Sequence, residues 1–333
     1  MTQPASAHYL HDAEQHLSAR CLRSALIQPL WSGYGECFRA WFEGYPTPLV
    51  VKAVQPPDTA SHPRGWDHQD AHDRKCLSFQ IERTFYQFYQ PRLPDTCQTP
   101  ALVTSSENHK DGRLSALVLI MDDLDAQGFY RREQTLSPEA CRPVLNWLAH
   151  FHAHWLQDSA DNLWQTGCYW HLATRHKEWQ AMPAGNLKMQ ASAIDKMLAD
   201  CPYQTVLHGD AKVANFCFNE TLSDCAAVDF QYTGKGPGIK DVAYFLGSAL
   251  SLQDQMDATT FCLDIYFTAL DKALDNGPFA PQRKHIIATW RSLYPFACAD
   301  FHRFLSGWSP GHHKINPALE QQTHVALSML VNS

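Results

Sequence analysis

The apolar positions of the chain follow two different periods. In the first third, short apolar runs alternate with polar turns, which is typical of strands. The clearest runs are Leu49–Val54, Ala101–Thr104 and Leu114–Met121. From about residue 137 onward, apolar residues recur at helical spacing instead. The segments with this period are Ser137–Trp155, Leu187–Leu198, Val242–Leu252, Ala258–Asp275, Arg283–Leu305 and Pro317–Val331. The pattern predicts a small β-rich part followed by a larger helical part.

One of the predicted strands carries a charge. Lys52 lies inside the apolar run Leu49–Val54, and a buried ammonium is costly unless it has a partner. The segment Lys75–Tyr89 has apolar residues at near-helical spacing, at Leu77, Ile81, Phe85 and Phe88, with Glu82 beside this stripe. We expect Glu82 to pair with Lys52; the alternative is an edge strand and a helix face that both meet solvent.

The most informative stretch is Thr205–Gln231. A His-Gly-Asp triplet ends at Asp210, Asn215 follows after four residues, and Asp229 comes later in an Asp-Phe-Gln triplet. Two short apolar segments between them, Asn215–Phe218 and Cys225–Val228, flank a polar turn and predict a hairpin. Such a hairpin would fold Asp229 back beside Asn215.

These residue types suit phosphoryl transfer. One carboxylate, Asp210, can orient an attacking hydroxyl and accept its proton, while Asn215 and Asp229 can hold Mg²⁺ against nucleotide phosphates. Either triplet alone could arise by chance, because Asp and Asn favour turns for local hydrogen-bonding reasons. The order and loop spacing together match the kinase pattern H-R-D-x-x-x-x-N followed by D-F-G, with Gly209 and Gln231 as departures.

The run HGDAKVAN…VDFQ resembles the aminoglycoside phosphotransferase and choline kinase superfamily of small-molecule kinases, and especially its ecdysteroid-kinase-like branch. The resemblance implies an α+β, two-lobed protein-kinase-like fold. Residues 1–123 would form the nucleotide-binding lobe and residues 124–333 the catalytic and acceptor-binding lobe. It further implies ATP and Mg²⁺ as cofactors and a small-molecule alcohol as acceptor.

The resemblance also suggests roles outside the central run. Lys52, held by Glu82, would contact the nucleotide phosphates. Asp122 would lie at the hinge between the lobes, where backbone groups meet adenine. Lys212 would steady the transferred phosphate, with a solvated loop charge as the alternative. Asp241 would brace the catalytic loop from beneath.

A glycine-containing turn precedes the lysine strand. Gly33 and Gly35 lie between two potential strands and could cover the nucleotide, because glycines let a backbone approach phosphate oxygens closely. The third glycine of the protein-kinase loop is absent, with Phe38 in its place. A plain hairpin turn is the alternative.

Composition excludes several other classes. The formal charge of −7, from 27 Lys+Arg and 34 Asp+Glu, does not favour nucleic-acid binding. The 333 residues contain no apolar stretch long enough for a membrane span. The N-terminus does not follow the pattern of a secretory signal. The 11 cysteines are scattered, without a C-x-x-C pair, so we expect reduced thiols and a cytoplasmic protein.

Two other functions stay open at this point: a nucleotide-binding regulator without turnover, and a protein kinase. Intact Lys52, Asp210, Asn215 and Asp229 argue against the first. The eleven residues between Asp229 and Asp241 argue against the second, because a protein kinase needs a longer segment there to bind a peptide.

The acceptor itself cannot be chosen among choline-like, sterol-like, sugar and aminoglycoside alcohols. An aromatic region near the C-terminus, with basic residues interleaved, would suit an apolar or cationic alcohol; it comprises Tyr294, Phe296, Phe301, Phe304 and Trp308 with His302, Arg303, His312, His313 and Lys314. Ser61–Arg74 contains three histidines, but its spacing does not support zinc. We expect a mobile or substrate-facing loop there.

Overall fold

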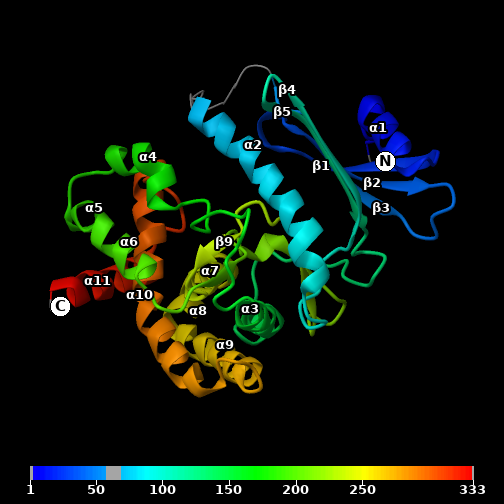
Figure 1. Cartoon of the computed structure of the whole chain (residues 1–333). Coiled ribbons are helices and arrows are strands. Elements are labelled where there is room, and N and C mark those ends of the chain that lie inside the picture. The colour runs from blue at the N-terminus through cyan, green and yellow to red at the C-terminus, as the bar shows by residue number, and fades with distance from the viewer. Residues whose placement is uncertain (1–2, 58–68, 332–333) are drawn as a thin grey trace. The chain divides into compact units, whose positions relative to one another are not determined.

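The computed structural model describes residues 3–57 and 69–331 (Figure 1). The chain divides into two compact units. The first comprises residues 1–92 and 99–130, and the second comprises residues 93–98 and 131–333. Within the described ranges, no helix has the length and apolarity that crossing a membrane requires.

The first unit is built on a five-stranded antiparallel sheet. Its strands, in spatial order, are β1 (Cys21–Pro29), β2 (Gly35–Phe42), β3 (Leu49–Val54), β5 (Arg113–Asp122) and β4 (Leu102–Lys110). The turn between β4 and β5 has positive φ at both Asp111 (52°) and Gly112 (76°), as tight hairpin turns require. Strands β4 and β5 pair antiparallel, so the predicted strand pair is confirmed, but β4 runs to Lys110, beyond its predicted end at Thr104.

The two faces of the sheet have different partners because successive side chains alternate. Val51 and Ala53 of β3 lie in an apolar cluster that includes Ala13 of α1 (Ala7–Leu17). Lys52 lies on the opposite face and meets Glu82 of α2 (Gln69–Thr84). Helix α2 packs against β5 and is drawn in cyan beside the strands (Figure 1).

The helix predicted over Lys75–Tyr89 differs from the structure at both ends. Helix α2 begins at Gln69, so residues 69–74 are helical rather than part of the expected loop. The other residues of the expected loop, 61–68, lie outside the described residues. The helix continues as a π-helical turn, η2 (Phe85–Tyr89), and a 3-10 turn, η3 (Gln90–Arg92).

The predicted apolar stripe of this helix is partly wrong. Leu77 and Phe88 are 41% and 61% exposed, respectively. The buried side chains of the segment include Phe79, Glu82 and Tyr86 instead. The buried face includes a polar residue because Glu82 is paired there, and hydrophobicity alone does not identify it.

The second unit is mainly helical, as predicted. Its helices are α3 (Arg142–His154), α4 (His176–Ala181), α5 (Asn186–Met189), α6 (Ala191–Ala199), α7 (Ile239–Ala249), α8 (Leu252–Asp257), α9 (Thr259–Leu274), α10 (Arg283–Trp308) and α11 (Pro317–Val331). Helix α10 packs against α4, α6, α7, α9 and α11, and α3 packs against α9. The helix expected over Leu187–Leu198 is two helices, because Gln190 leaves helical geometry at φ −92° and ψ 4°.

Two short strand pairs carry the central run. Strand β6 (Thr205–Leu207) pairs with β9 (Gly234–Gly236), and β7 (Phe216–Phe218) pairs with β8 (Cys225–Ala227). Additional 3-10 turns are η1 (Trp31–Gly33), η4 (Glu139–Cys141), η5 (Leu172–Arg175), η6 (Val213–Asn215) and η7 (Ala280–Gln282). All six residues of β7 and β8 are buried, which anchors this ribbon in the unit.

Candidate active site

The predicted hairpin forms, and its strands lie within the two predicted segments. Phe216 pairs with Ala227 in the antiparallel β7–β8 ribbon. One residue further out, the backbone N–H of Val228 donates to the carbonyl oxygen of Asn215 at 2.9 Å. Asp229 is the next residue after this bond. The ribbon therefore brings the chain at Asp229 back to the chain at Asn215, although 13 residues separate them in sequence.

Asp210 has two differently used carboxylate oxygens. Its Oδ2 accepts hydrogen bonds from Nζ of Lys212 at 2.9 Å and from Nδ2 of Asn215 at 3.1 Å. The same Nδ2 donates to the backbone carbonyl of Asp210 at 2.8 Å. Its Oδ1 is buried and has no hydrogen-bond partner among the described residues. The carboxylate is thus held on one side and keeps an unused acceptor on the other.

Asp241 fixes the backbone just before Asp210. Its two oxygens accept the backbone N–H groups of His208 at 2.7 Å and of Gly209 at 3.0 Å. Nε2 of His152 lies 3.1 Å from Oδ2 of the same carboxylate. Asp241, His152 and His208 are all fully buried. This geometry matches the bracing position that the resemblance implies for Asp241.

Gly209 is required by its conformation and by its surroundings. Its φ is +82°, and an added Cβ would lie 1.8 Å from the carbonyl oxygen of Tyr232. L-residues with a side chain rarely adopt this region. The glycine that replaces the arginine of the protein-kinase triplet is therefore demanded by close packing.

Asp229 adopts a left-handed backbone with φ +71°, which costs free energy for a residue other than glycine. Its Oδ1 accepts a hydrogen bond from Nε2 of Gln231 at 2.8 Å. Such strain persists where the surrounding structure enforces it, which is typical of functional sites.

The charges around Asp210 shift their neighbours. Burial lowers the pKa of His208, against attraction from Asp241 and Asp210. For Lys212, burial lowers the pKa, but Asp210 and Asp229 together outweigh it and the pKa is raised overall. Lys212 therefore stays protonated, and both Asp210 and Asp229 stabilise its charge.

Sequence reasoning did not single out the tyrosines near Asp210. The hydroxyls of Tyr169 and Tyr244 lie 3.2 Å apart, and burial followed by the charge of Asp210 raises the pKa of each. Tyr244 lies three residues after Asp241 on α7, so it shares that helix face; this spacing was the available signal. Tyr169 comes from a distant loop, and no local pattern marks it.

The predicted C-terminal aromatic region reaches this site only in part. Phe301, Phe304 and the half-buried Trp308 lie in one cluster with Tyr244 and Tyr169. The ammonium of Lys314 lies 4.8 Å from the centre of the Tyr244 ring. Burial lowers the pKa of Lys314 to about 8, with Asp210 opposing and Lys212 adding to that effect. Lys314 therefore belongs to the surroundings of Asp210.

The expected ion pair of the first unit is present. Nζ of Lys52 donates to Oε2 of Glu82 at 2.6 Å, and the two side chains are 9% and 2% exposed. The Lys52 ammonium also lies 5.7 Å from the centre of the Phe79 ring. The lysine is thereby fixed on the α2 face of the sheet.

The glycine turn links β1 and β2 as expected. Gly33 has φ +75° with open space around it, whereas Gly35 has φ +136° and an added Cβ would lie 2.0 Å from the carbonyl oxygen of Ala53. Gly35 is thus required by close packing on β3.

Asp122 ends β5, and its Oδ2 accepts a hydrogen bond from Nε2 of Gln127 at 3.3 Å. Burial raises the pKa of this carboxyl.

The two residues expected to hold Mg²⁺, Asn215 and Asp229, offer oxygen donors of the kind that this ion prefers. Within residues 3–57 and 69–331, no group of three or more His, Cys, Asp and Glu could hold a metal ion. Because Nδ2 of Asn215 is turned to Asp210, its amide oxygen is the atom left to act as a ligand. An amide oxygen and the Asp229 carboxylate are hard donors, and Mg²⁺ commonly takes one or two protein ligands plus substrate phosphates.

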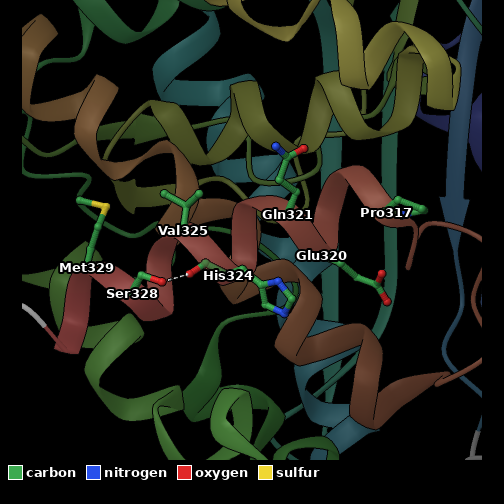
Figure 2. Close-up of a pocket in the computed structure, with 7 residues that line it drawn as sticks. All are labelled: Pro317, Glu320, Gln321, His324, Val325, Ser328 and Met329. Carbon is green, nitrogen blue, oxygen red and sulfur yellow. Dashed lines mark hydrogen bonds between the residues drawn. The ribbon is translucent and has the colours of Figure 1, made fainter.

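Two surface pockets do not include any expected site residue. Figure 2 shows the first, which is lined by a single helix, α11. Its lining residues are Pro317, Glu320, Gln321, His324, Val325, Ser328 and Met329. The second lies between α3 and α9, where Asn146 and Ile265 are among the lining residues. Neither pocket brings together groups that suggest chemistry.

Comparison with known proteins supports the resemblance. The ecdysteroid kinase-like family matches residues 169–277, which include the whole central run. The sequence has no match among curated proteins.

Three solved structures share the fold at low identity. A microcompartment-associated aminopropanol kinase has a TM-score of 0.51 at 11% identity, over 92% of this chain and 90% of that one. Amicoumacin kinase has a TM-score of 0.52 at 11% identity, over 90% of this chain and 86% of that one. Spectinomycin phosphotransferase has a TM-score of 0.51 at 12% identity, over 98% of this chain and 100% of that one. The chain therefore resembles the ecdysteroid kinase-like family over residues 169–277 and has the α+β, two-lobed protein-kinase-like fold of small-molecule phosphotransferases.

Proposed function

We propose that this protein is an ATP- and Mg²⁺-dependent phosphotransferase that acts on a hydroxyl of a small molecule. The observation that carries the proposal is the environment of Asp210. Lys212 and Asn215 hold Oδ2, and Oδ1 is left without a partner in the described chain. A carboxylate held in this way is suited to orient a hydroxyl and to accept its proton.

The other site residues of the second unit would neutralise charge on the phosphates or hold the catalytic loop in position. Asn215 and Asp229 would hold Mg²⁺, which supplies charge neutralisation at the nucleotide phosphates. Lys212 is cationic and hydrogen-bonded to Asp210, which suits a role at the transferred phosphate. Asp241 would act as a positioning residue through the backbone of His208 and Gly209.

The first unit would supply nucleotide binding. Lys52 would contact the ATP phosphates, with Glu82 keeping it in place. The turn with Gly33 and Gly35 would cover the phosphates, and the backbone at Asp122 would meet adenine. Catalysis would rest on positioning and charge neutralisation rather than on a covalent enzyme intermediate.

The segment after Asp229 supports a small acceptor over a protein. It turns back as β9, which pairs with β6. Gly234 is packed so closely that an added Cβ would lie 2.2 Å from the carbonyl oxygen of Trp164. A segment that belongs to the core in this way is unsuited to seat a peptide.

The similar structures support the same class of reaction. Their names describe kinases of aminopropanol and amicoumacin and a phosphotransferase of spectinomycin, and two of them are complexes with AMP-PNP and Ca²⁺ or with ADP. We assign the activity to the cytoplasm, where its 11 free cysteines would stay reduced.

The test is a screen of hydroxylated compounds, including amino alcohols, sterols, sugars and aminoglycosides. ADP release that depends on Mg-ATP and a phosphorylated product in the mass spectrum are the expected results. Asp210→Asn should reduce turnover by about 10² or more while nucleotide still binds, and the exposed Asp95→Asn should have no effect. Nucleotide binding without turnover would favour an inactive regulator, and transfer to proteins alone would favour a protein kinase.

A further inference from the structure

The aromatic groups near Asp210 form a continuous wall. The ring centre of Tyr169 lies 5.6 Å from that of Tyr232 and 5.5 Å from that of Phe304. Phe304 in turn stacks on Trp308, with centres 5.6 Å apart. Tyr169, Tyr232 and Trp308 are only half-buried, so this aromatic wall offers apolar surface that a ring could cover.

The protein's own cations already occupy several ring faces of this region. Arg175 lies 5.4 Å from the Phe304 ring centre, and Lys314 lies 4.8 Å from that of Tyr244 and 5.8 Å from that of Phe301. A cationic acceptor would therefore lose those ring faces and meet like charges.

Lys314 differs from the other cations nearby. Arg175 is paired with Glu178, and Lys212 is paired with Asp210. In the part of the chain that the structure describes, the Lys314 ammonium has no carboxylate within ion-pair distance and no hydrogen bond. An ammonium that is half-buried without an anion is costly, and a bound anion would relieve that cost.

The loop between α10 and α11 holds Lys314 in place. Its backbone N–H donates to Nδ1 of His312 at 3.1 Å. The N–H of Ile315 donates to the carbonyl oxygen of His312 at 2.9 Å, and Nδ2 of Asn316 donates to Gln255 at 3.2 Å. These hydrogen bonds fix the backbone of the loop that carries Lys314.

We infer that Lys314 binds an anionic group of the acceptor, so that the substrate is an acidic, ring-bearing alcohol rather than an amino alcohol. This inference rests on the proposed function, because it takes Asp210 as the group that receives the acceptor hydroxyl. The aromatic wall would cover the ring, Lys314 would pair with the anion, and Asp210 would receive the hydroxyl.

The test uses three ring alcohols that share a hydroxymethylbenzene core and carry an anionic, a neutral or a cationic para substituent: 4-(hydroxymethyl)benzoate, 1,4-benzenedimethanol and 4-(hydroxymethyl)benzylamine. Binding is measured by NMR titration of the full chain without nucleotide, so no phosphate can compete for Lys314. We expect the benzoate to bind about tenfold more tightly than the neutral diol, and the amine to bind most weakly.

Three variants complete the experiment. Lys314→Met should abolish the preference for the benzoate, Lys314→Arg should keep it, and Lys196→Met, an exposed lysine on α6, should match the wild type. Binding of none of the three compounds, equal binding, or an unchanged preference in Lys314→Met overturns the inference.

Turnover with Mg-ATP separates the two proposals. If hydroxyl compounds are phosphorylated and Lys314→Met lowers kcat equally for all charges, Lys314 contacts the transferred phosphate and the acidic-acceptor inference fails alone. If no hydroxyl compound of the wide screen is phosphorylated, the proposed function fails, while the binding preference still decides whether Lys314 recognises an anion.

Discussion

The carboxylate of Asp241 accepts the backbone N–H of His208 at 2.7 Å, two residues before Asp210. Its other oxygen accepts the N–H of Gly209, so one buried side chain fixes two consecutive peptide groups. The conformation of the segment that ends at Asp210 therefore depends on a residue more than 30 positions later in the sequence.

Replacing this acceptor should loosen the catalytic loop. In Asp241→Asn, an NH₂ group faces a backbone N–H, which leaves a buried donor without an acceptor. We expect the free energy of unfolding to fall by about 2–3 kcal/mol and kcat to fall by about tenfold or more. Urea denaturation and initial rates measure the two effects. Wild-type kcat in this variant would show that the brace has no role in positioning Asp210.

Gly209 offers a sharper test of the same loop. Gly209→Ala combines an unfavourable positive φ, which costs about 1–2 kcal/mol, with a contact of 1.8 Å to the carbonyl of Tyr232. We expect a total loss above about 2 kcal/mol in denaturant unfolding. The control is Gly247→Ala on α7, where an added Cβ would have nothing within 4 Å. Alanine at this helical position should raise the free energy of unfolding by about 0.5–1 kcal/mol. Equal effects of the two changes would contradict the described backbone.

The Lys52–Glu82 pair should contribute both to stability and to nucleotide binding. Glu82→Gln leaves a buried ammonium without its anion and should cost about 3–5 kcal/mol. Lys52→Met should weaken ATP binding by about tenfold or more, whereas the exposed Lys110→Met should not. The double variant Lys52→Met/Glu82→Gln should be more stable than Glu82→Gln alone. Additive losses would mean that the pair is not energetically coupled.

Lys314 should give acceptor binding a dependence on pH. Its pKa is lowered to about 8, and the protonated form is the one that binds an anion. The affinity for 4-(hydroxymethyl)benzoate should therefore be at its maximum below about pH 8, and it should fall about tenfold for each pH unit above that value. Around it, the pKa values of Lys212 and Tyr244 are raised above their ordinary values, so neither titrates in this window.

The matched variant gives the control for this pH profile. Arginine stays protonated throughout the range, so binding by Lys314→Arg should remain flat from pH 7 to about pH 10. A wild-type profile that is also flat would rule out the lysine as the titrating group.

Local motifs carried most of what the sequence could reveal. The β7–β8 ribbon was predictable because its apolar strands, polar turn and flanking acids lie within one short run. The partner of Lys52 was predictable because a buried charge demands one, and Glu82 was the acid beside the next helical stripe. In both cases a single physical requirement linked neighbouring segments.

The acceptor side was not predictable in the same way. Tyr169 and Tyr244 come from a loop and a helix far apart in sequence, and only the packed fold brings them together. Lys314 was expected in the C-terminal aromatic region, but its place beside Tyr244 appears only in the fold. The face of α2 was misjudged at Leu77 and Phe88 for a related reason. Burial there follows an ion pair and a π-helical turn, neither of which an apolar period records.

The β7–β8 ribbon also determines which changes of length the chain can tolerate. Its tip is exposed and closed on itself, with the N–H of Ser223 donating to Oδ1 of Asn219 at 2.9 Å. Residues added at this tip would extend into solvent. One residue added within either strand would turn the following side chains to the opposite face of the ribbon, disturb two strands whose residues are all buried and separate Asn215 from Asp229. Length variation among related chains should therefore be confined to the tip.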